Sequence, residues 1–337
     1  MNIIGHCNLL ENLAKLSTRK NRPQSMLFTG IYGVGKFSSA VWYASLLNCA
    51  SPVMKDFAMP CGTCISCRKI KSGNHPDIKI IEPDEKTFNI KIEQIRGLSH
   101  EASYFPLEGK CKVFIVRNAH RMLDGAASAY LKLLEEPPEY MVHILTSVNI
   151  NLMLPTIVSR CTQIRFLPLE KNLIMDFLTE RKDISPEQAG IFAAVSQGSI
   201  GRAISLMEDE KFMSARNGLF ELLSVFNSID IADLTIRADG LLSGDFDGNV
   251  FFELIILWLR DLIFVKSGVS DSFLINSDYV FALKEQANNV SLKQILSACE
   301  FISYAESQLS YQVSPALVLD RLIKYTAGAL RSYRPDN

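Results

Sequence analysis

The first half of the chain alternates short apolar runs with helical patterns. The runs are rich in β-branched and aromatic residues and predict strands at residues 25–29, 78–82, 112–116 and 142–147. Residues 125–136 carry apolar side chains at helical spacing, and Pro137-Pro138 ends that helix because proline lacks a backbone N–H. Strands joined by crossover helices predict an α/β domain with a parallel sheet and helices on both faces.

From about Leu169 onward, amphipathic helical patterns follow one another without predicted strands. They lie at residues 173–179, 186–195, 203–207, 219–226, 251–265, 292–309 and 315–330. Breaks at residues 197–199 and 208–211 predict an α/β domain over 1–168, a small all-α domain over 169–210 and a larger all-α domain over 211–337. Residues 251–259 are apolar on nearly all sides, which favours a central bundle helix over one shared with a neighbouring subunit.

Composition excludes several classes of protein. The 337 residues include 35 Lys and Arg and 36 Asp and Glu, so the formal net charge of -1 gives no overall positive field for coating nucleic acid. The most apolar stretch, residues 250–265, is interrupted by charged side chains and is too short to span a bilayer. The first 20 residues lack the pattern of a secretory signal, so we expect a cytoplasmic protein.

A glycine-rich loop follows the first predicted strand. Its candidate phosphate-binding residues are Gly30, Gly33, Gly35 and Lys36. Glycines let backbone N–H groups point at phosphate oxygens, the lysine supplies a cation, and the following helix adds its positive N-terminal end. A glycine-rich turn without a ligand is the alternative.

Two further positions argue against hydrolysis at this loop. Residue 37 is Phe, where the pattern requires a Ser or Thr hydroxyl for magnesium, and Ser38 lies about 100° further round the helix. The predicted strand 112–116 is followed by Arg117-Asn118, whereas an ATPase needs acids there to hold magnesium and to activate water. Binding of ATP or ADP therefore stays open, and intrinsic hydrolysis is not expected.

The eight cysteines include a group with metal-ligand spacing. Cys61, Cys64 and Cys67 form C-x2-C-x2-C, and Cys49 lies twelve positions upstream. Four thiolates in a reducing compartment predict a tetrahedral structural zinc site, with an iron–sulfur cluster or no metal as alternatives. His75 is close enough in sequence to be considered as a ligand, but a structural role in its loop is preferred. The remaining cysteines are interpreted as small hydrophobic residues.

The order of these motifs resembles the clamp-loader subunits of bacterial DNA polymerase III. The segments that carry the resemblance are residues 30–36, the four cysteines, Gly73-Asn74-His75-Pro76-Asp77, residues 133–138, residues 154–161 and residues 198–203. It covers about residues 1–210, and the C-terminal part agrees only in being helical. The resemblance implies an AAA+ ATPase-type domain with a zinc module at about 49–67, a helical lid, and a helical collar that assembles a five-subunit loader.

Within this family the sequence is similar to a non-hydrolysing subunit type. The motor, called gamma or tau, would have Ser or Thr at 37, acids at 117 and 118, and Arg at the position of Gly201, whereas this chain has Arg202 one position later. The resemblance implies that Arg160, in Ser159-Arg160-Cys161, acts in trans as an arginine finger on the nucleotide of a neighbouring motor subunit. An ordinary surface arginine is the alternative.

The resemblance also implies the partners and the cellular location. The partners are the gamma/tau and delta subunits, with the sliding clamp and primed DNA reached through the assembled complex, in the cytoplasmic replisome of a bacterium and without a membrane. No intrinsic ATPase activity is expected of the chain, although the assembly belongs to a DNA-directed DNA polymerase. The alternatives are an active motor subunit and a zinc-module protein that binds nucleic acid directly. The near-neutral charge and the lack of basic runs interleaved with aromatic residues argue against the latter.

Overall fold

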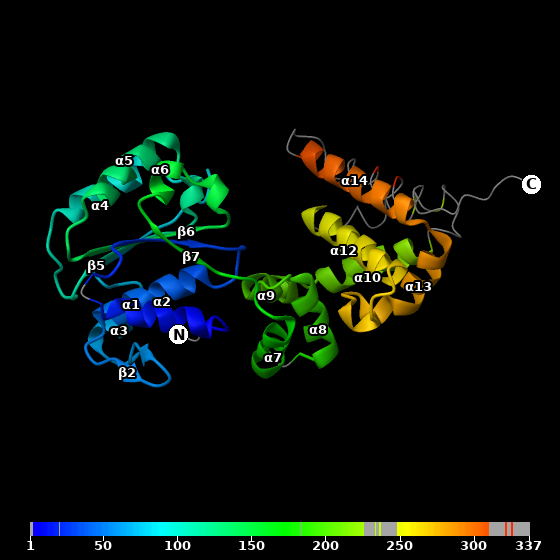
Figure 1. Ribbon diagram of the computed structural model, residues 1–337, viewed down its shortest axis with the longest axis horizontal. Helices are drawn as coiled ribbons and strands as arrows, with labels where there is room; N and C mark the ends of the chain where they lie inside the picture. Colours follow the sequence, from blue (N-terminus) through cyan, green and yellow to red (C-terminus); the bar gives the residue numbers. More distant parts are fainter. Residues whose placement is uncertain are drawn as a thin grey trace, which may run out of the picture. The chain divides into compact units, whose positions relative to one another are not determined.

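The computed structural model describes residues 3–19, 21–182, 184–225 and 248–309, together with positions 233, 236, 321 and 325. The chain divides into two compact units (Figure 1). The first unit comprises Met1–Pro186 and Ser196–Arg202, and the second comprises Glu187–Val195 and Ala203–Asn337. The division into three domains, with boundaries at 168 and 210, stays a prediction.

A five-stranded parallel sheet forms the centre of the first unit. Its strands are β1 (Ser25–Thr29), β4 (Ile78–Ile81), β5 (Lys112–Val116), β6 (Met141–Ser147) and β7 (Thr162–Arg165), in the spatial order β4-β5-β6-β1-β7. All neighbouring pairs are parallel, which confirms the predicted sheet. The sequence does not predict β7, because this edge strand is mostly exposed and its polar residues carry no buried apolar run.

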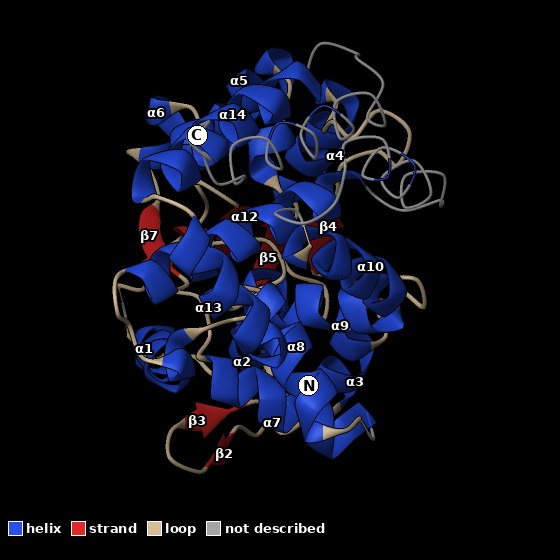
Figure 2. Cartoon of the chain, turned by 90° about the vertical axis from the view of Figure 1, so that its right-hand side faces the viewer, coloured by secondary structure: helices blue, strands red, loops and turns tan. Residues whose placement is uncertain are grey.

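Helices cover both faces of this sheet (Figure 1). The helices on one face are α1 (Cys7–Ser17), α2 (Lys36–Asn48) and α3 (Ile65–Lys71), and those on the other are α4 (Ile92–Ala102), α5 (Asp124–Glu135) and α6 (Pro155–Val158). On the second face, Leu27, Phe114 and Leu145 from the strands form one core with Ile95 and Tyr130 from the helices. The short strands β2 (Val53–Met54) and β3 (Ala58–Met59) form an antiparallel hairpin away from the sheet (Figure 2).

After β7, the described residues contain helices and short turns but no strand. The longer helices are α7 (Lys171–Lys182), α8 (Pro186–Val195), α9 (Ile200–Glu208), α10 (Phe212–Ser224), α12 (Gly248–Lys266), α13 (Val280–Asn289) and α14 (Leu292–Leu309). The helical second half is thus confirmed, and the helix predicted at 315–330 lies outside the described residues. Most apolar side chains of α12 are buried and Ile256 is 41% exposed, in keeping with a central helix. None of the described helices is long and apolar enough to cross a bilayer.

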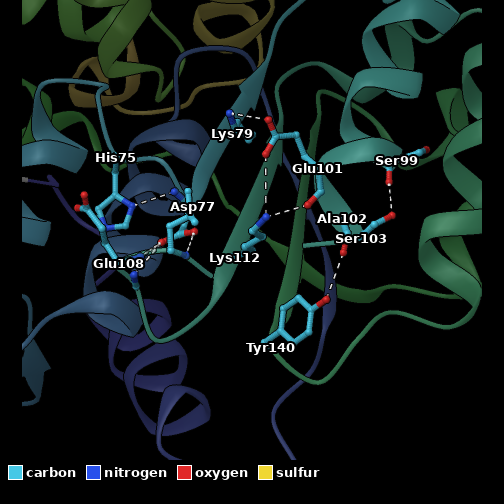
Figure 3. A network of polar contacts seen from close by, with 12 residues as sticks. His75, Asp77, Lys79, Ser99, Glu101, Ala102, Ser103, Glu108, Lys112 and Tyr140 are labelled. Atoms are coloured by element: carbon cyan, nitrogen blue, oxygen red, sulfur yellow. Dashed lines mark hydrogen bonds and ion pairs between the residues drawn. The ribbon is translucent and has the colours of Figure 1, made fainter. Parts of the chain in front are cut away.

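A buried carboxylate anchors the turn that leads into β5 (Figure 3). Asp77, which is 1% exposed, accepts hydrogen bonds from the backbone N–H groups of Leu107, Glu108 and Gly109 at 2.7, 2.8 and 2.7 Å. Burial by itself would raise the pKa of Asp77, but the three N–H donors outweigh it and hold the pKa below its ordinary value. The Nδ1 atom of His75 accepts a hydrogen bond from the backbone N–H of Asp77 at 3.2 Å, so both residues stabilise the chain around the start of β4 and the turn before β5.

Removal of this carboxylate tests its contribution to the fold. Asp77→Ala leaves three partly buried N–H groups without their acceptor, and we expect the free energy of unfolding to fall by about 2–4 kcal/mol at pH 7. Because the folded pKa lies below the unfolded one, the contribution is complete above pH ~5 and is lost as pH falls through the folded value. Urea denaturation followed by circular dichroism should therefore show a difference between Asp77→Ala and wild type that shrinks on acidification.

The matched control is Glu108→Ala. The Glu108 carboxylate forms an exposed ion pair with Lys69 at 2.5 Å, so its loss should change stability by less than about 1 kcal/mol. A wild-type unfolding midpoint for Asp77→Ala at pH 7 would show that the turn does not depend on this carboxylate.

Candidate functional site

The predicted phosphate loop connects β1 to the N-terminus of α2. Gly30, Gly33 and Gly35 have φ angles of 148°, 72° and 109°, a region of backbone conformation that favours glycine. A Cβ atom at Gly30 would collide with the backbone oxygen of Phe166, so close chain packing also requires glycine there. The structure therefore brings the four predicted residues together in one loop at a helix N-terminus.

The Lys36 side chain turns back onto this loop. Its Nζ donates to the backbone oxygens of Gly30 and Ile31 at 2.5 and 2.6 Å, and the residue is only 6% exposed. Burial lowers the pKa of Lys36 to about 8. In this arrangement the ammonium group is satisfied by the protein's own carbonyl groups.

Phe37 and Arg117, two of the positions at which the sequence departs from the pattern of a magnesium-dependent ATPase, contact each other. The Arg117 guanidinium lies over the Phe37 ring, 5.0 Å from its centroid, and its Nη1 pairs with Glu82 at 2.9 Å. A guanidinium over an aromatic face is a favourable cation–π contact, and neither group ligates magnesium. Sequence analysis identified the two positions separately, but only the fold shows that they contact each other.

A second segment of the first unit packs against the phosphate loop. The backbone N–H of Gly201 donates to the oxygen of Gly33 at 2.9 Å, and the N–H of Arg202 donates to Ser199 Oγ at 3.1 Å. A Cβ atom added to Gly201 would lie 2.9 Å from Gly33 Cα, closer than real Cβ contacts. Glycine at position 201 thus lets the two backbones touch.

His6 contacts the same loop from the N-terminal side. Its Nε2 lies 3.0 Å from the Val34 oxygen, and its ring packs edge-on against Phe166 with centroids 5.0 Å apart. Burial lowers the pKa of His6, which favours the neutral ring. Sequence reasoning assigned no role to His6, because a lone histidine at the start of a helix carries no local signal.

The four predicted cysteines form one cluster. Their sulfur atoms all lie within 4.8 Å of one another, at the end of α2, beside the β2–β3 hairpin and at the start of α3. Sulfurs in a tetrahedral zinc site lie about 3.8 Å apart, given Zn–S bonds of about 2.3 Å, so the cluster has the right size for a metal ion. His75 does not belong to this cluster, which agrees with its preferred structural role.

Backbone donors around the cluster support thiolate ligands. The N–H groups of Cys61, Cys64 and Cys67 donate to the sulfurs of Cys49, Cys61 and Cys64 at 3.3, 3.3 and 3.4 Å. Hydrogen bonds from the N–H groups of Cys64 and Thr63 lower the pKa of Cys61 to about 5, whereas burial raises the pKa of Cys49. A metal ion would favour deprotonation of all four thiols.

Arg160 follows the short helix α6, which lies on the opposite face of the sheet from α2 and α3 (Figure 1). Its Nη2 pairs with Glu135 Oε1 at 3.0 Å, and its Nη1 donates to the Thr156 oxygen at 3.0 Å. The side chain is 37% exposed. The sequence alone does not connect Glu135 with Arg160, because 25 positions separate the two residues.

Two family models match the chain. A model described as "DNA polymerase III, delta subunit" matches residues 5–170, and one described as "DNA polymerase III, delta subunit, C terminal" matches residues 210–325. Together they account for most of the sequence, including the C-terminal part that the motifs did not reach.

Several known proteins are similar to this chain. The DNA polymerase III subunit delta' of Bacillus subtilis is 28% identical over 311 residues, which are 91% of this chain and 92% of that protein. The DNA polymerase III subunit tau of Escherichia coli is 31% identical over 211 residues, which are 61% of this chain and 32% of that protein. Among solved structures, a DNA polymerase III gamma subunit-related protein from Thermotoga maritima matches with a TM-score of 0.49 at 18% identity, covering 96% of this chain and 99% of the other.

Proposed function

Because this chain belongs to the delta-prime family of bacterial DNA polymerase III clamp-loader subunits, we propose that it supports ATP hydrolysis by a neighbouring subunit without hydrolysing ATP itself. The contact between Phe37 and Arg117 carries this proposal. Phosphoryl transfer depends on a positioned metal ion and on a group that orients water, and this contact offers neither.

The contacts of Lys36 and Gly33 within the protein would compete with nucleotide binding to this loop. ATP or ADP would have to replace the carbonyl partners of Lys36 and compete with the backbone contact between Gly33 and Gly201. Binding without hydrolysis remains compatible with the glycine-rich loop, and we propose no catalytic role for it. The loop then serves as a packing surface between the start of α2 and residues 199–202.

The trans role is assigned to Arg160. Guanidinium groups bridge two phosphate oxygens in a fixed fork, and the exposure of Arg160, just after a short helix, supports contact with another molecule. On a neighbouring motor subunit, the group would stabilise negative charge that develops on the nucleotide as water attacks its terminal phosphorus and the bond to ADP breaks. The partners are accordingly gamma/tau and delta subunits, with the sliding clamp and primed DNA reached through the complex.

The cysteine cluster is proposed to hold structural zinc. Four sulfur ligands leave no open position for a water molecule, so the ion would stabilise the module formed by residues 49–67 and take no part in catalysis. The proposal also includes an AAA+ fold for the first domain, a lid at 169–210, a collar at 211–337 and a place in a cytoplasmic replisome.

An active motor subunit is the second candidate. Sequence identity of 31% to the tau subunit of Escherichia coli favours the motor role over a third role, in which the zinc module binds nucleic acid directly. Phe37 and Arg117 argue against the motor role, because neither side chain ligates magnesium. Nucleic-acid binding by the isolated chain would instead appear as retention of primed DNA without partner subunits.

Zinc analysis tests the metal proposal. The purified chain should contain about one zinc ion per molecule, because four thiolates fill a tetrahedral site. Cys64→Ser should lower the zinc content and increase proteolysis within residues 49–67, and Cys299→Ser is the control because Cys299 lies outside the cluster. Elemental analysis that finds iron, or no metal at all, would contradict the assignment.

An ATPase assay tests the absence of hydrolysis. The isolated chain with Mg²⁺ and ATP should release phosphate at the background rate, and Lys36→Ala should leave that rate unchanged. If a magnesium-dependent activity is present and Lys36→Ala abolishes it, the motor interpretation is correct.

Reconstitution of the loader tests Arg160. Arg160→Ala should assemble normally but lower clamp- and DNA-stimulated ATP hydrolysis by at least about 10-fold, less than the full effect of an arginine finger because a loader has several ATP sites. Arg160→Lys should restore little, since an ammonium group does not reproduce the fork. Arg96→Ala removes an exposed arginine from α4 and serves as the control. If the loader with Arg160→Ala hydrolyses ATP and loads clamps at the wild-type rate, Arg160 is an ordinary surface residue.

A further inference from the structure

The position of Glu135 is defined by the end of its helix. Glu135 is the last residue of α5, and Glu136 leaves helical geometry with φ -133° and ψ 66° before the two prolines stop the chain from continuing. The two adjacent acidic residues therefore differ in their contacts. Glu135 forms an ion pair with Arg160, whereas no ion pair of Glu136 occurs among the residues that the structure describes.

Arg160 is held at two points that belong to different elements. Its Nη2 contacts the Glu135 carboxylate on α5, and its Nη1 contacts the Thr156 carbonyl oxygen on α6, both at 3.0 Å. A guanidinium has five N–H donors, and each terminal nitrogen carries two of them. Each terminal nitrogen therefore keeps one hydrogen for another acceptor while the plane of the group is fixed.

This contact contributes little to the stability of the fold. The side chains of Arg160 and Glu135 are 37% and 52% exposed, and ion pairs at such exposed sites stabilise proteins weakly. Its main physical effect is to restrict the rotamers of a long side chain before a ligand arrives. An arginine that is already oriented loses less conformational freedom when it meets phosphate.

We propose that Glu135 is a positioning residue that holds the Arg160 guanidinium in the orientation in which it meets the nucleotide of a neighbouring subunit. This inference rests on the trans role of Arg160 given under the proposed function. The ligand chemistry is that of a nucleoside triphosphate bound to another chain. The opposite possibility is a latch, in which Glu135 retains the arginine and slows the reaction, and the sign of the mutational effect separates the two.

The experiment uses the reconstituted loader with sliding clamp, primed DNA and ATP. Glu135→Ala should lower kcat about 3- to 5-fold with little change in KM for ATP, because orientation of a transition-state contact is lost while nucleotide binding occurs on the other subunit. Glu135→Gln retains an oxygen that accepts a hydrogen bond and should stay within about 2-fold of wild type. Glu136→Ala, one position along the chain, is the matched control and should behave as wild type.

A double variant separates positioning from a general structural effect. If Glu135 acts only through Arg160, then Glu135→Ala combined with Arg160→Ala should be no slower than Arg160→Ala alone. Additive losses, an increased kcat for Glu135→Ala, or failure of that variant to assemble in native mass spectrometry would each overturn the positioning role. A wild-type rate for Arg160→Ala would refute the trans role itself, whereas a slow Arg160→Ala with a wild-type Glu135→Ala would refute the positioning role alone.

Discussion

Backbone pairing of β1 with parallel strands on both sides is the constraint on which the first unit depends. Thr29, at the end of β1, is in register with Ser147 of β6 and with Arg165 of β7. Parallel strands end on the same edge of a sheet, so the loops that follow β1, β5 and β6 leave from that edge. This arrangement brings Phe37 and Arg117 into contact although one lies on α2 and the other after β5.

The glycine-rich loop at this edge of the sheet makes its polar contacts within the protein. Glycines produce the curled loop, Lys36 is bound by the loop's own carbonyl groups, and Arg117 stacks on Phe37 beside it. Gly201 has no side chain to offer and instead allows its backbone to touch Gly33. Backbone contact between Gly33 and Gly201 thus joins two segments of the first unit.

The proposed functions belong to separate parts of the first unit. The cysteine cluster lies at the end of α2 and the start of α3, whereas Arg160 follows α6 in the layer on the opposite face of the sheet (Figure 1). The parallel sheet lies between these layers. In the second unit, the buried Arg216 forms two 2.8 Å bonds with Asp278 and stacks on Phe220, so a paired charge also orders the helical part.

The sequence alone determined the buried strands, the glycine-rich loop and the cysteine group. Residues 25–29 and 112–116 were predicted with the bounds that β1 and β5 have, because strands buried on both faces appear as continuous apolar runs. Cysteine spacing likewise predicted that the four sulfurs lie together, since short loops limit where the sulfurs can lie. Tertiary structure alone decided the edge strand β7, the contact between Phe37 and Arg117, and the pairing of Arg160 with Glu135. These features depend on partners that are distant along the chain, and local periodicity carries information about which face of an element is buried but not about which distant side chain it will meet.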